Sequence, residues 1–148
     1  MTDSTVTQQA DILLVEDNSD DRELTILALQ ANGLLNGIDT VNDGVEAVDY
    51  LFARGAFRDR DRSDRPRLIL LDINMPRMSG LEVLRLIKAD DELRSIPVVV
   101  LTSSREEISD CYANGANSYI VKPVEFDGFL TSMKTVGLYW LLLNEPPR

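Results

Sequence analysis

The stretch Leu68-Ile-Leu-Leu-Asp-Ile-Asn-Met-Pro-Arg-Met-Ser-Gly80 decides the fold of this chain. Four aliphatic residues lead directly into Asp72, and the turn formers Pro76 and Gly80 follow. A continuous apolar run that ends at such residues is typical of a strand buried on both faces of a parallel sheet. Asp72 then falls at the carboxyl end of the strand, where open α/β sheets place their functional groups. We therefore expect Asp72 to be held rigidly from behind and to be exposed enough to react.

The same design recurs along the chain. Largely apolar runs occupy residues 12–15, 97–101 and 118–121, and residues 38–41 are typical of a further short strand. Segments with helical periodicity separate these runs, so that five strands alternate with five helices. Such alternation predicts an α/β fold in which helices cover both faces of a parallel sheet. In one short domain it favours the doubly wound, flavodoxin-like (βα)5 arrangement with strand order 2-1-3-4-5.

Two connecting segments carry more specific expectations. In the first helix, we expect a cap at Ser19 or Asp20 and an inward stripe formed by Leu24, Leu27, Ala28 and Ala31. The segment 54–67 alternates in charge and is long for a connection between a helix and a strand. We interpret it as a solvated surface loop, with an insertion that contacts a partner protein as the alternative.

Composition narrows the function classes. The chain has 148 residues, is 44% hydrophobic and 27% charged, and carries a net charge of −10, which argues against nucleic-acid and anionic-membrane partners. It contains no histidine, which excludes His-based catalysis, and Cys111 is its single cysteine, which excludes a disulfide framework. We find no membrane span and no signal peptide, and therefore expect a cytoplasmic protein. We expect a flexible tail over residues 1–11, one domain over 12–144 and a short tail over 145–148.

Polar residues follow four of the five predicted strands, namely Glu16 with Asp17, Asp72, Thr102 and Lys122. Parallel strands bring these positions to one edge of the sheet. Three carboxylates in one place repel one another unless a cation lies between them, and hard oxygen ligands with room for water and phosphate suit Mg²⁺. Lys122 can hold an anion that arrives at Asp72, and the Thr102 hydroxyl can donate to it. This combination predicts phosphoryl transfer to a carboxylate, which forms an acyl phosphate.

Each of these residues also has an ordinary structural explanation. Asp17 and Thr102 can act as helix caps, Lys122 can be a solvated lysine, and Asp72 can be a turn residue. For these explanations to hold together, every residue would have to fall at a strand end by coincidence. We therefore favour the functional interpretation of the whole set.

At this point the sequence resembles the receiver domain of two-component response regulators, from Ile12 to about Leu143. The resemblance lies in four stretches: Leu14-Val-Glu-Asp-Asn18, Leu71-Asp-Ile-Asn-Met-Pro-Arg-Met-Ser-Gly80, Val100-Leu-Thr-Ser103 and Val121-Lys-Pro123. It implies a signalling domain that accepts a phosphoryl group from a sensor histidine kinase. Such a domain catalyses only its own phosphorylation and dephosphorylation, and is not otherwise an enzyme.

The resemblance also implies a role for each matching residue. Asp72 is the expected phosphoacceptor, and Lys122 is expected to contact the phosphoryl group. Thr102 is expected to move toward that group and, together with Tyr119, to switch the face built from the fourth helix, fifth strand and fifth helix. Half-buried packing is the ordinary explanation for Tyr119. The expected Mg²⁺ ligands are Glu16, Asp17, Asp72 and the main-chain carbonyl of Asn74.

A finer resemblance is to stand-alone response regulators that accompany bacterial phytochrome kinases. It lies in the charged segment before the Asp72 strand, in Leu101-Thr-Ser-Ser104, in Lys122-Pro-Val-Glu-Phe126 and in the helix end around Trp140. It makes a bacteriophytochrome a candidate for the partner kinase. Because Arg148 ends the sequence without an output domain, we expect the output to be contact with a downstream protein or transfer to a histidine phosphotransfer partner.

The last helix is expected to be apolar on more than one side. Its inward stripe at helical spacing is Phe126, Phe129, Leu130, Met133, Val136 and Trp140. Four further apolar residues extend the apolar surface: Leu138, Tyr139, Leu141 and Leu142. We favour a homodimer interface for these four residues, with packing under the domain's own N-terminus as the alternative.

Three other functions compete with this interpretation. Phosphohydrolases of the haloacid dehalogenase type also use an Asp nucleophile, but carry it in an Asp-x-Asp motif after the first strand, whereas Asp72 follows the third and Asn74 replaces the second acid. A flavodoxin-like cofactor binder would need a phosphate-binding loop after a strand, which we do not find. A receiver used purely for docking would not need the intact set of acidic residues.

Overall fold

The structure, a computed structural model, describes residues 12–31 and 37–135. Strands and helices alternate along the chain as the sequence predicts. The strands are β1 (Ile12–Val15), β2 (Ile38–Val41), β3 (Leu68–Asp72), β4 (Val98–Thr102) and β5 (Ser118–Val121). The α-helices are α2 (Ser19–Ala31), α3 (Gly44–Phe52), α4 (Gly80–Ala89), α5 (Ile108–Ala113) and α6 (Phe126–Thr135), and the 3-10 helices are η1 (Gly55–Phe57) and η2 (Arg105–Glu107).

The five strands form one parallel sheet in the order β2-β1-β3-β4-β5, which confirms the predicted flavodoxin-like fold. The register aligns the strand ends. Val15 pairs with Leu71, Asp72 with Leu101, and Thr102 with Val121. The residues that end or follow these strands therefore share one edge of the sheet.

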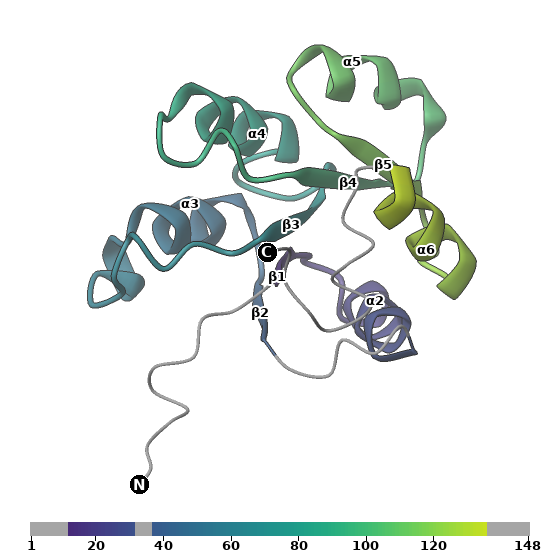
Figure 1. Cartoon of the computed structure of the whole chain (residues 1–148), viewed down its shortest axis with the longest axis horizontal. Helices are drawn as coiled ribbons and strands as arrows, with labels where there is room; N and C mark the ends of the chain where they lie inside the picture. Colours follow the sequence, from purple (N-terminus) through teal and green to yellow (C-terminus); the bar gives the residue numbers. More distant parts are fainter. Residues whose placement is uncertain (1–11, 32–36, 136–148) are drawn as a thin grey trace, which may run out of the picture.

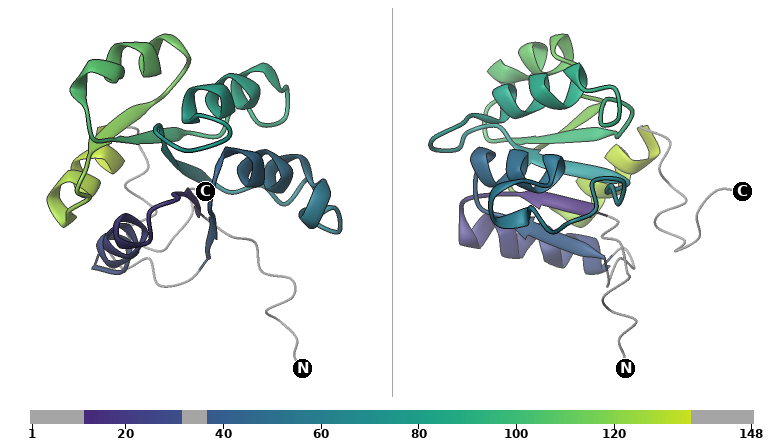
Figure 2. Two further views of the ribbon diagram at one scale, coloured as in Figure 1. Left: turned by 180° about the vertical axis from the view of Figure 1, so that it is seen from behind. Right: turned by 90° about the vertical axis from the view of Figure 1, so that its left-hand side faces the viewer.

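Side chains from the strands alternate between the two faces of the sheet, and each face has its own core. Leu13 and Val15 of β1 face α3 and α4, whereas Ile12 and Leu14 pack with Phe129 of α6 and with α2. Figure 1 shows α3 and α4 on one side of the sheet and α2 and α6 on the other, and the view from behind in Figure 2 shows the same layers. Both faces of the central strands are thus covered, which explains their unbroken apolar sequences.

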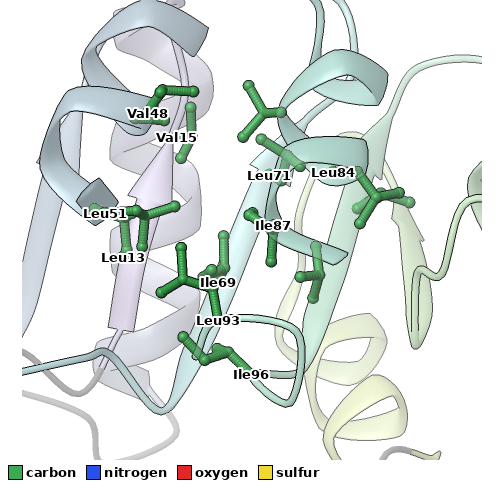
Figure 3. Close-up of a cluster of buried hydrophobic side chains, with 14 of the residues drawn as sticks. Leu13, Val15, Val48, Leu51, Ile69, Leu71, Leu84, Ile87, Leu93 and Ile96 are labelled. Atoms are coloured by element: carbon green, nitrogen blue, oxygen red, sulfur yellow. The ribbon is translucent and has the colours of Figure 1, made fainter. Parts of the chain in front are cut away.

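The core against α3 and α4 is drawn in Figure 3. Leu13 and Ile69 of the sheet lie close to Leu51 of α3, and Leu71 lies beside Leu84 and Ile87 of α4. Val83, Leu84 and Ile87 recur at helical spacing, and each is fully buried. Ser79 caps this helix through a capping box with Glu82.

The first helix differs from its prediction. Leu24 is 43% exposed and Leu27 is 52% exposed, and the buried residues of α2 are Thr25, Ala28 and Leu29. Thr25 can be buried because its hydroxyl donates to the main-chain oxygen of Asp21 at 2.8 Å. Of the expected stripe only Ala28 is correct, since Ala31 is also exposed.

The cap of this helix was also predicted wrongly. Neither Ser19 nor Asp20 caps α2. Instead, Asn18 Oδ1 accepts a hydrogen bond from the Asp21 amide at 2.9 Å.

The charged segment 54–67 lies mostly at the surface, as predicted, but two of its arginines pack against the domain. Arg60 lies over the Tyr50 ring, with its guanidinium carbon 3.8 Å from the ring centroid, and also donates to the Tyr50 main-chain oxygen. Arg62 lies over the Phe52 ring and pairs with Asp90 at 2.5 Å. The arginines thus attach the segment to α3 and to the connection after α4, and its alternating charges are used within the domain.

Several predictions concern residues outside the described part of the chain. They are the tails at residues 1–11 and 145–148, the stripe residues Val136 and Trp140, and the expected dimer residues Leu138, Tyr139, Leu141 and Leu142. Within α6, Phe129 is buried and Leu130 is half-buried, as expected. Among the described helices, none combines the length and the hydropathy that a membrane crossing requires.

Candidate functional site at the carboxyl edge of the sheet

Asp72 is the last residue of β3 and is only 2% exposed, which is less than the sequence suggested. Its Oδ1 accepts a hydrogen bond from the Asn74 amide at 3.1 Å. The following helix approaches this strand end closely, because the Gly80 amide donates to the Ile73 oxygen at 3.0 Å. A Cβ at Gly80 would collide with the main chain of Asp72, so this approach requires glycine.

Two acidic residues that follow β1 reach the same place. One carboxylate oxygen from each of Glu16, Asp17 and Asp72 can be chosen such that all three lie within 4.8 Å of one another. Glu16 is fully buried, whereas Asp17 is exposed. The cluster therefore has two carboxylates held in the fold and one that faces solvent.

Lys122, directly after β5, supplies the positive charge of this cluster. Its Nζ lies 2.9 Å from Glu16 Oε1, 3.2 Å from Asp72 Oδ2 and 3.1 Å from Asp21 Oδ2. Its side chain is only 14% exposed, so it is not an ordinary solvated lysine. Asp21 lies in the first turn of α2, and the sequence analysis gave it no role. Its only sequence signal is its place one helical turn beyond Asp17.

These contacts move the pKa values in opposite directions. Burial and the neighbouring Glu16 carboxylate raise the pKa of Asp72 to about 7, although Lys122 and the Asn74 amide act against this rise. Burial alone would lower the pKa of Lys122, but its hydrogen bond to Glu16 and the charge of Asp72 hold this pKa above its ordinary value. The site therefore carries more negative charge than Lys122 neutralises.

Thr102 ends β4 and is fully buried, but its hydroxyl is engaged away from Asp72. Thr102 Oγ1 lies 2.8 Å from the Ser104 main-chain oxygen and 3.2 Å from Glu107 Oε1. It accepts from the Ser104 amide at 3.1 Å. Ser104 itself caps η2, since its side chain accepts from the Glu106 amide, so Thr102 is not the cap of this turn.

Glu107 is a second residue that the sequence analysis missed. Its Oε1 accepts from Thr102 Oγ1 at 3.2 Å and from Asn74 Nδ2 at 3.1 Å. It therefore joins the connection after β3 to the end of β4. No local motif marks Glu107, because Asn74 is 33 positions away in the sequence and Thr102 lies at the end of β4.

Comparison with known proteins identifies the family. The sequence matches the response regulator receiver domain over residues 12–134. The chain belongs to the response regulator receiver family. It is 38% identical over 138 residues to the probable methanogenesis regulatory protein FilR2 of Methanothrix harundinacea, covering 92% of this chain and 86% of that protein. It is 35% identical to response regulator Rcp1 of Synechocystis, covering 88% of each chain.

Solved structures place this receiver beside phytochrome-associated response regulators. The bacteriophytochrome response regulator RtBRR is 47% identical, with a TM-score of 0.83, and covers 95% of this chain and 85% of its own. The phosphorylated cyanobacterial phytochrome response regulator RcpA is 36% identical, with a TM-score of 0.72 and coverage of 95% and 98%. The Mn²⁺-bound form of Rcp1 is 33% identical, with a TM-score of 0.72 and coverage of 93% and 98%.

In this receiver, an ion pair fixes the connection between Asp72 and α4. Arg77 Nη2 and Nε lie 2.7 and 3.1 Å from Asp43 Oδ2, and Asp43 also caps α3. Arg77 adopts a φ of 67°, which non-glycine residues rarely do. The ion pair thus holds a strained turn next to the site.

Tyr119 is half-buried in β5, and its ring packs edge-on against Tyr112 of α5, with 6.1 Å between the centroids. A groove of about 490 Å³ lies beside this pair, between α5, β5 and α6, and Tyr112, Tyr119 and Thr131 contribute to its walls. The receiver thus has a hollowed face on the three elements that the sequence analysis expected to switch.

Proposed function

We propose that this receiver accepts a phosphoryl group on Asp72 from a partner histidine kinase in the presence of Mg²⁺. The observation that carries the proposal is the contact of Lys122 Nζ with Asp72 Oδ2 at 3.2 Å, inside a cluster that also contains Glu16 and Asp17. A buried carboxylate with one cation and two further acids beside it matches the requirements of phosphoryl transfer, which depends on positioning and on neutralised charge.

The donor set fits Mg²⁺. Glu16, Asp17 and Asp72 offer hard carboxylate oxygens. Burial and the Glu16 carboxylate raise the pKa of Asp72, so a cation among these oxygens would favour its charged form. The main-chain carbonyl of Asn74 is the fourth proposed ligand. When bound, Mg²⁺ would supply charge neutralisation for the transferred group. The Mn²⁺-bound form of Rcp1 is a relative that binds a divalent cation.

In the proposed reaction, a carboxylate oxygen of Asp72 forms a bond to phosphorus as the bond from phosphorus to the phosphohistidine nitrogen breaks. The electron pair of the broken bond stays on the imidazole nitrogen of the kinase. Lys122 is placed to neutralise the phosphoryl oxygens, and Thr102 would turn its hydroxyl toward them after transfer. The chain catalyses only this transfer and the later hydrolysis of the acyl phosphate, in which water attacks phosphorus, the Asp72 carboxylate leaves and inorganic phosphate is released. We therefore classify it as a signalling domain.

The same proposal covers switching. Movement of Thr102 would change the packing of Tyr119 and bias the face formed by α5, β5 and α6, where the groove lies. Its test is the NMR spectrum of the Tyr119 ring with and without a phosphoryl group. Unchanged shifts for Tyr119 and for its neighbours on α5 and α6 would contradict the switch.

The proposed partners follow from the relatives. The similarity to RtBRR makes a bacteriophytochrome kinase the first candidate donor, in the cytoplasm, and a downstream protein or histidine phosphotransfer protein the recipient of the signal. We keep the predicted domain limits of 12–144, with tails on either side, and the homodimer through Leu138, Tyr139, Leu141 and Leu142 as proposals. Light scattering of the full chain at high concentration tests the dimer.

Intact mass after incubation with acetyl phosphate and Mg²⁺ tests the central proposal. We expect one phosphoryl adduct in the wild-type protein and none in Asp72→Asn or after addition of EDTA. Absence of the adduct, without release of inorganic phosphate, would leave only a docking role. Sustained turnover of varied phosphate monoesters would instead favour a phosphohydrolase.

A further inference from the structure

Glu107 occupies a position from which it can oppose the proposed switch. It is the last residue of η2, directly before α5, and its side chain is half-buried. One oxygen of its carboxylate, Oε1, accepts from both the Thr102 hydroxyl and the Asn74 amide. Hydrogen bonds to a charged acceptor are stronger than those to a neutral one, so Glu107 stabilises the present positions of the Thr102 hydroxyl and the Asn74 side-chain amide.

Both donors belong to residues next to the phosphoacceptor. Asn74 links Glu107 to Asp72 directly, because its main-chain amide donates to Asp72 Oδ1 while its side-chain amide donates to Glu107. Thr102 has a single hydroxyl proton, and two acceptors on the side away from Asp72 share it: the Ser104 main-chain oxygen at 2.8 Å and Glu107 Oε1 at 3.2 Å. That proton cannot serve a phosphoryl oxygen until the hydroxyl turns.

From this geometry we propose that Glu107 is a latch that favours the unphosphorylated state. A phosphoryl group on Asp72 would compete with the Glu107 carboxylate for the Thr102 hydroxyl and the Asn74 amide, and the two anions would repel each other. The hydrogen bond between Glu107 and Thr102 must break before Thr102 can turn. Once it breaks, Glu107, which directly precedes α5, is free to move. Glu107 is thus a positioning residue that acts through Thr102 and Asn74. The inference rests on the proposed phosphorylation of Asp72.

The test compares Glu107→Ala and Glu107→Gln with Glu106→Gln as the matched control. Glu106 lies in the same turn and is exposed. At limiting acetyl phosphate with Mg²⁺, we expect the steady-state ratio of phosphorylated to unphosphorylated Glu107→Ala to exceed the wild-type ratio by roughly 10- to 100-fold, which is the effect of one hydrogen bond to a charged group. Glu107→Gln keeps an acceptor oxygen and should fall between the two, and Glu106→Gln should match the wild type.

A second measurement examines the latch without phosphorylation. The side-chain amide resonances of Asn74 and the methyl resonance of Thr102 should shift in Glu107→Ala and stay in place in Glu106→Gln. Equal adduct levels in the wild type and Glu107→Ala, or lower levels in Glu107→Ala with an unchanged unfolding midpoint, would overturn the latch alone. Absence of an adduct in every protein would overturn the proposed function and the latch with it.

Discussion

Lys122 and Lys88 lie at opposite edges of the same sheet and are surrounded by different kinds of oxygen. Lys122 contacts the carboxylates of Glu16, Asp21 and Asp72 at the carboxyl edge. Lys88, near the end of α4, reaches past the amino edge. Its Nζ lies 3.1 and 3.2 Å from the main-chain oxygens of Arg94 and Ile96, and 3.4 Å from Asn117 Oδ1.

The pKa values follow from these surroundings. Charged partners outweigh burial and raise the pKa of Lys122, whereas burial lowers the pKa of Lys88, whose partners are neutral dipoles. Lys88 ties together the connections that precede β4 and β5, and Gly115, with a φ of +100°, leaves room for its side chain. The amino edge is therefore built for stability, and the carboxyl edge keeps the excess charge that chemistry requires.

The largest effect that separates the two edges should come from Lys122→Met. We expect phosphorylation by acetyl phosphate to fall by roughly 10²-fold or more, because a positioned charge that faces the transferred group is lost. Without Mg²⁺ the variant should also lose about 3 kcal/mol of stability, since buried carboxylates lose their partner. Phosphorylation kinetics and urea unfolding measure the two effects. Wild-type phosphorylation kinetics in Lys122→Met would contradict the proposed role of the carboxyl edge in phosphorylation.

The pH dependence of metal-free stability sharpens the role of Asp72. Its pKa is about 7 in the folded protein and 3.8 ordinarily, so the folded state binds more protons between these values. Stability should therefore fall as pH rises from about 4 to about 7, and Asp72→Asn should remove this fall. In EDTA at pH 8, we expect the variant to be more stable by on the order of 2 kcal/mol, with a smaller difference at pH 5.

Urea unfolding at the two pH values gives this measurement, and excess Mg²⁺ should reduce the difference at pH 8. A variant that is less stable than the wild type at pH 8 in EDTA would show that Lys122 already neutralises the cluster.

At the amino edge, Lys88→Met should lower stability by about 1–3 kcal/mol, because it removes hydrogen bonds from a charged donor to three oxygens. Its phosphorylation rate should stay that of the wild type. Thermal unfolding and the acetyl phosphate reaction together provide the matched control for Lys122→Met. A slower phosphorylation of Lys88→Met would contradict the proposal that the amino edge contributes to stability and not to phosphorylation.

The smallest effect should come from Arg60→Ala in the charged segment. The variant loses the stacking on Tyr50 and the hydrogen bonds to the Tyr50 and Asp64 main-chain oxygens. We expect a loss of about 1 kcal/mol, which is the typical value of a cation–π contact and a hydrogen bond at a partly exposed position. An unchanged unfolding midpoint would return the segment to the solvated loop of the first prediction.

The sequence was sufficient for the fold because β1, β3 and β4 are buried on both faces and are followed by turn or polar residues. It also indicated that Glu16, Asp17, Asp72 and Lys122 would meet, because parallel strands align their ends and polar residues follow them. The assignment of a role to each residue stays a proposal. Its strongest structural support is the contact of Lys122 with Asp72, and the burial of Lys122 that accompanies this contact has no signal in the sequence.

Other features depend on side-chain geometry that a linear pattern does not contain. The stripe of α2 was misjudged because burial was assigned to leucines, whereas Thr25 can be buried once its hydroxyl bonds to Asp21. Asp21 and Glu107 were missed because their partners are tertiary: Lys122 for Asp21, and Asn74 for Glu107. The half-burial of Arg60 and Arg62 was not predicted, because their aromatic partners lie before the segment and the acidic partner of Arg62 lies after it.

The hydrogen bond between Lys122 and Asp21 joins residues 101 positions apart and brings the end of an outer strand to the beginning of the chain. β5 pairs with β4 at one end of the described sheet, whereas Glu16, Asp17 and Asp72 follow the adjacent strands β1 and β3. Local opening of β5 and α6, the kind of partial unfolding that hydrogen exchange detects, would withdraw Lys122 and leave the three acids in place. The proposed cation binding would then report on the centre of the domain, whereas the proposed phosphoryl acceptance would require that the last strand has also folded.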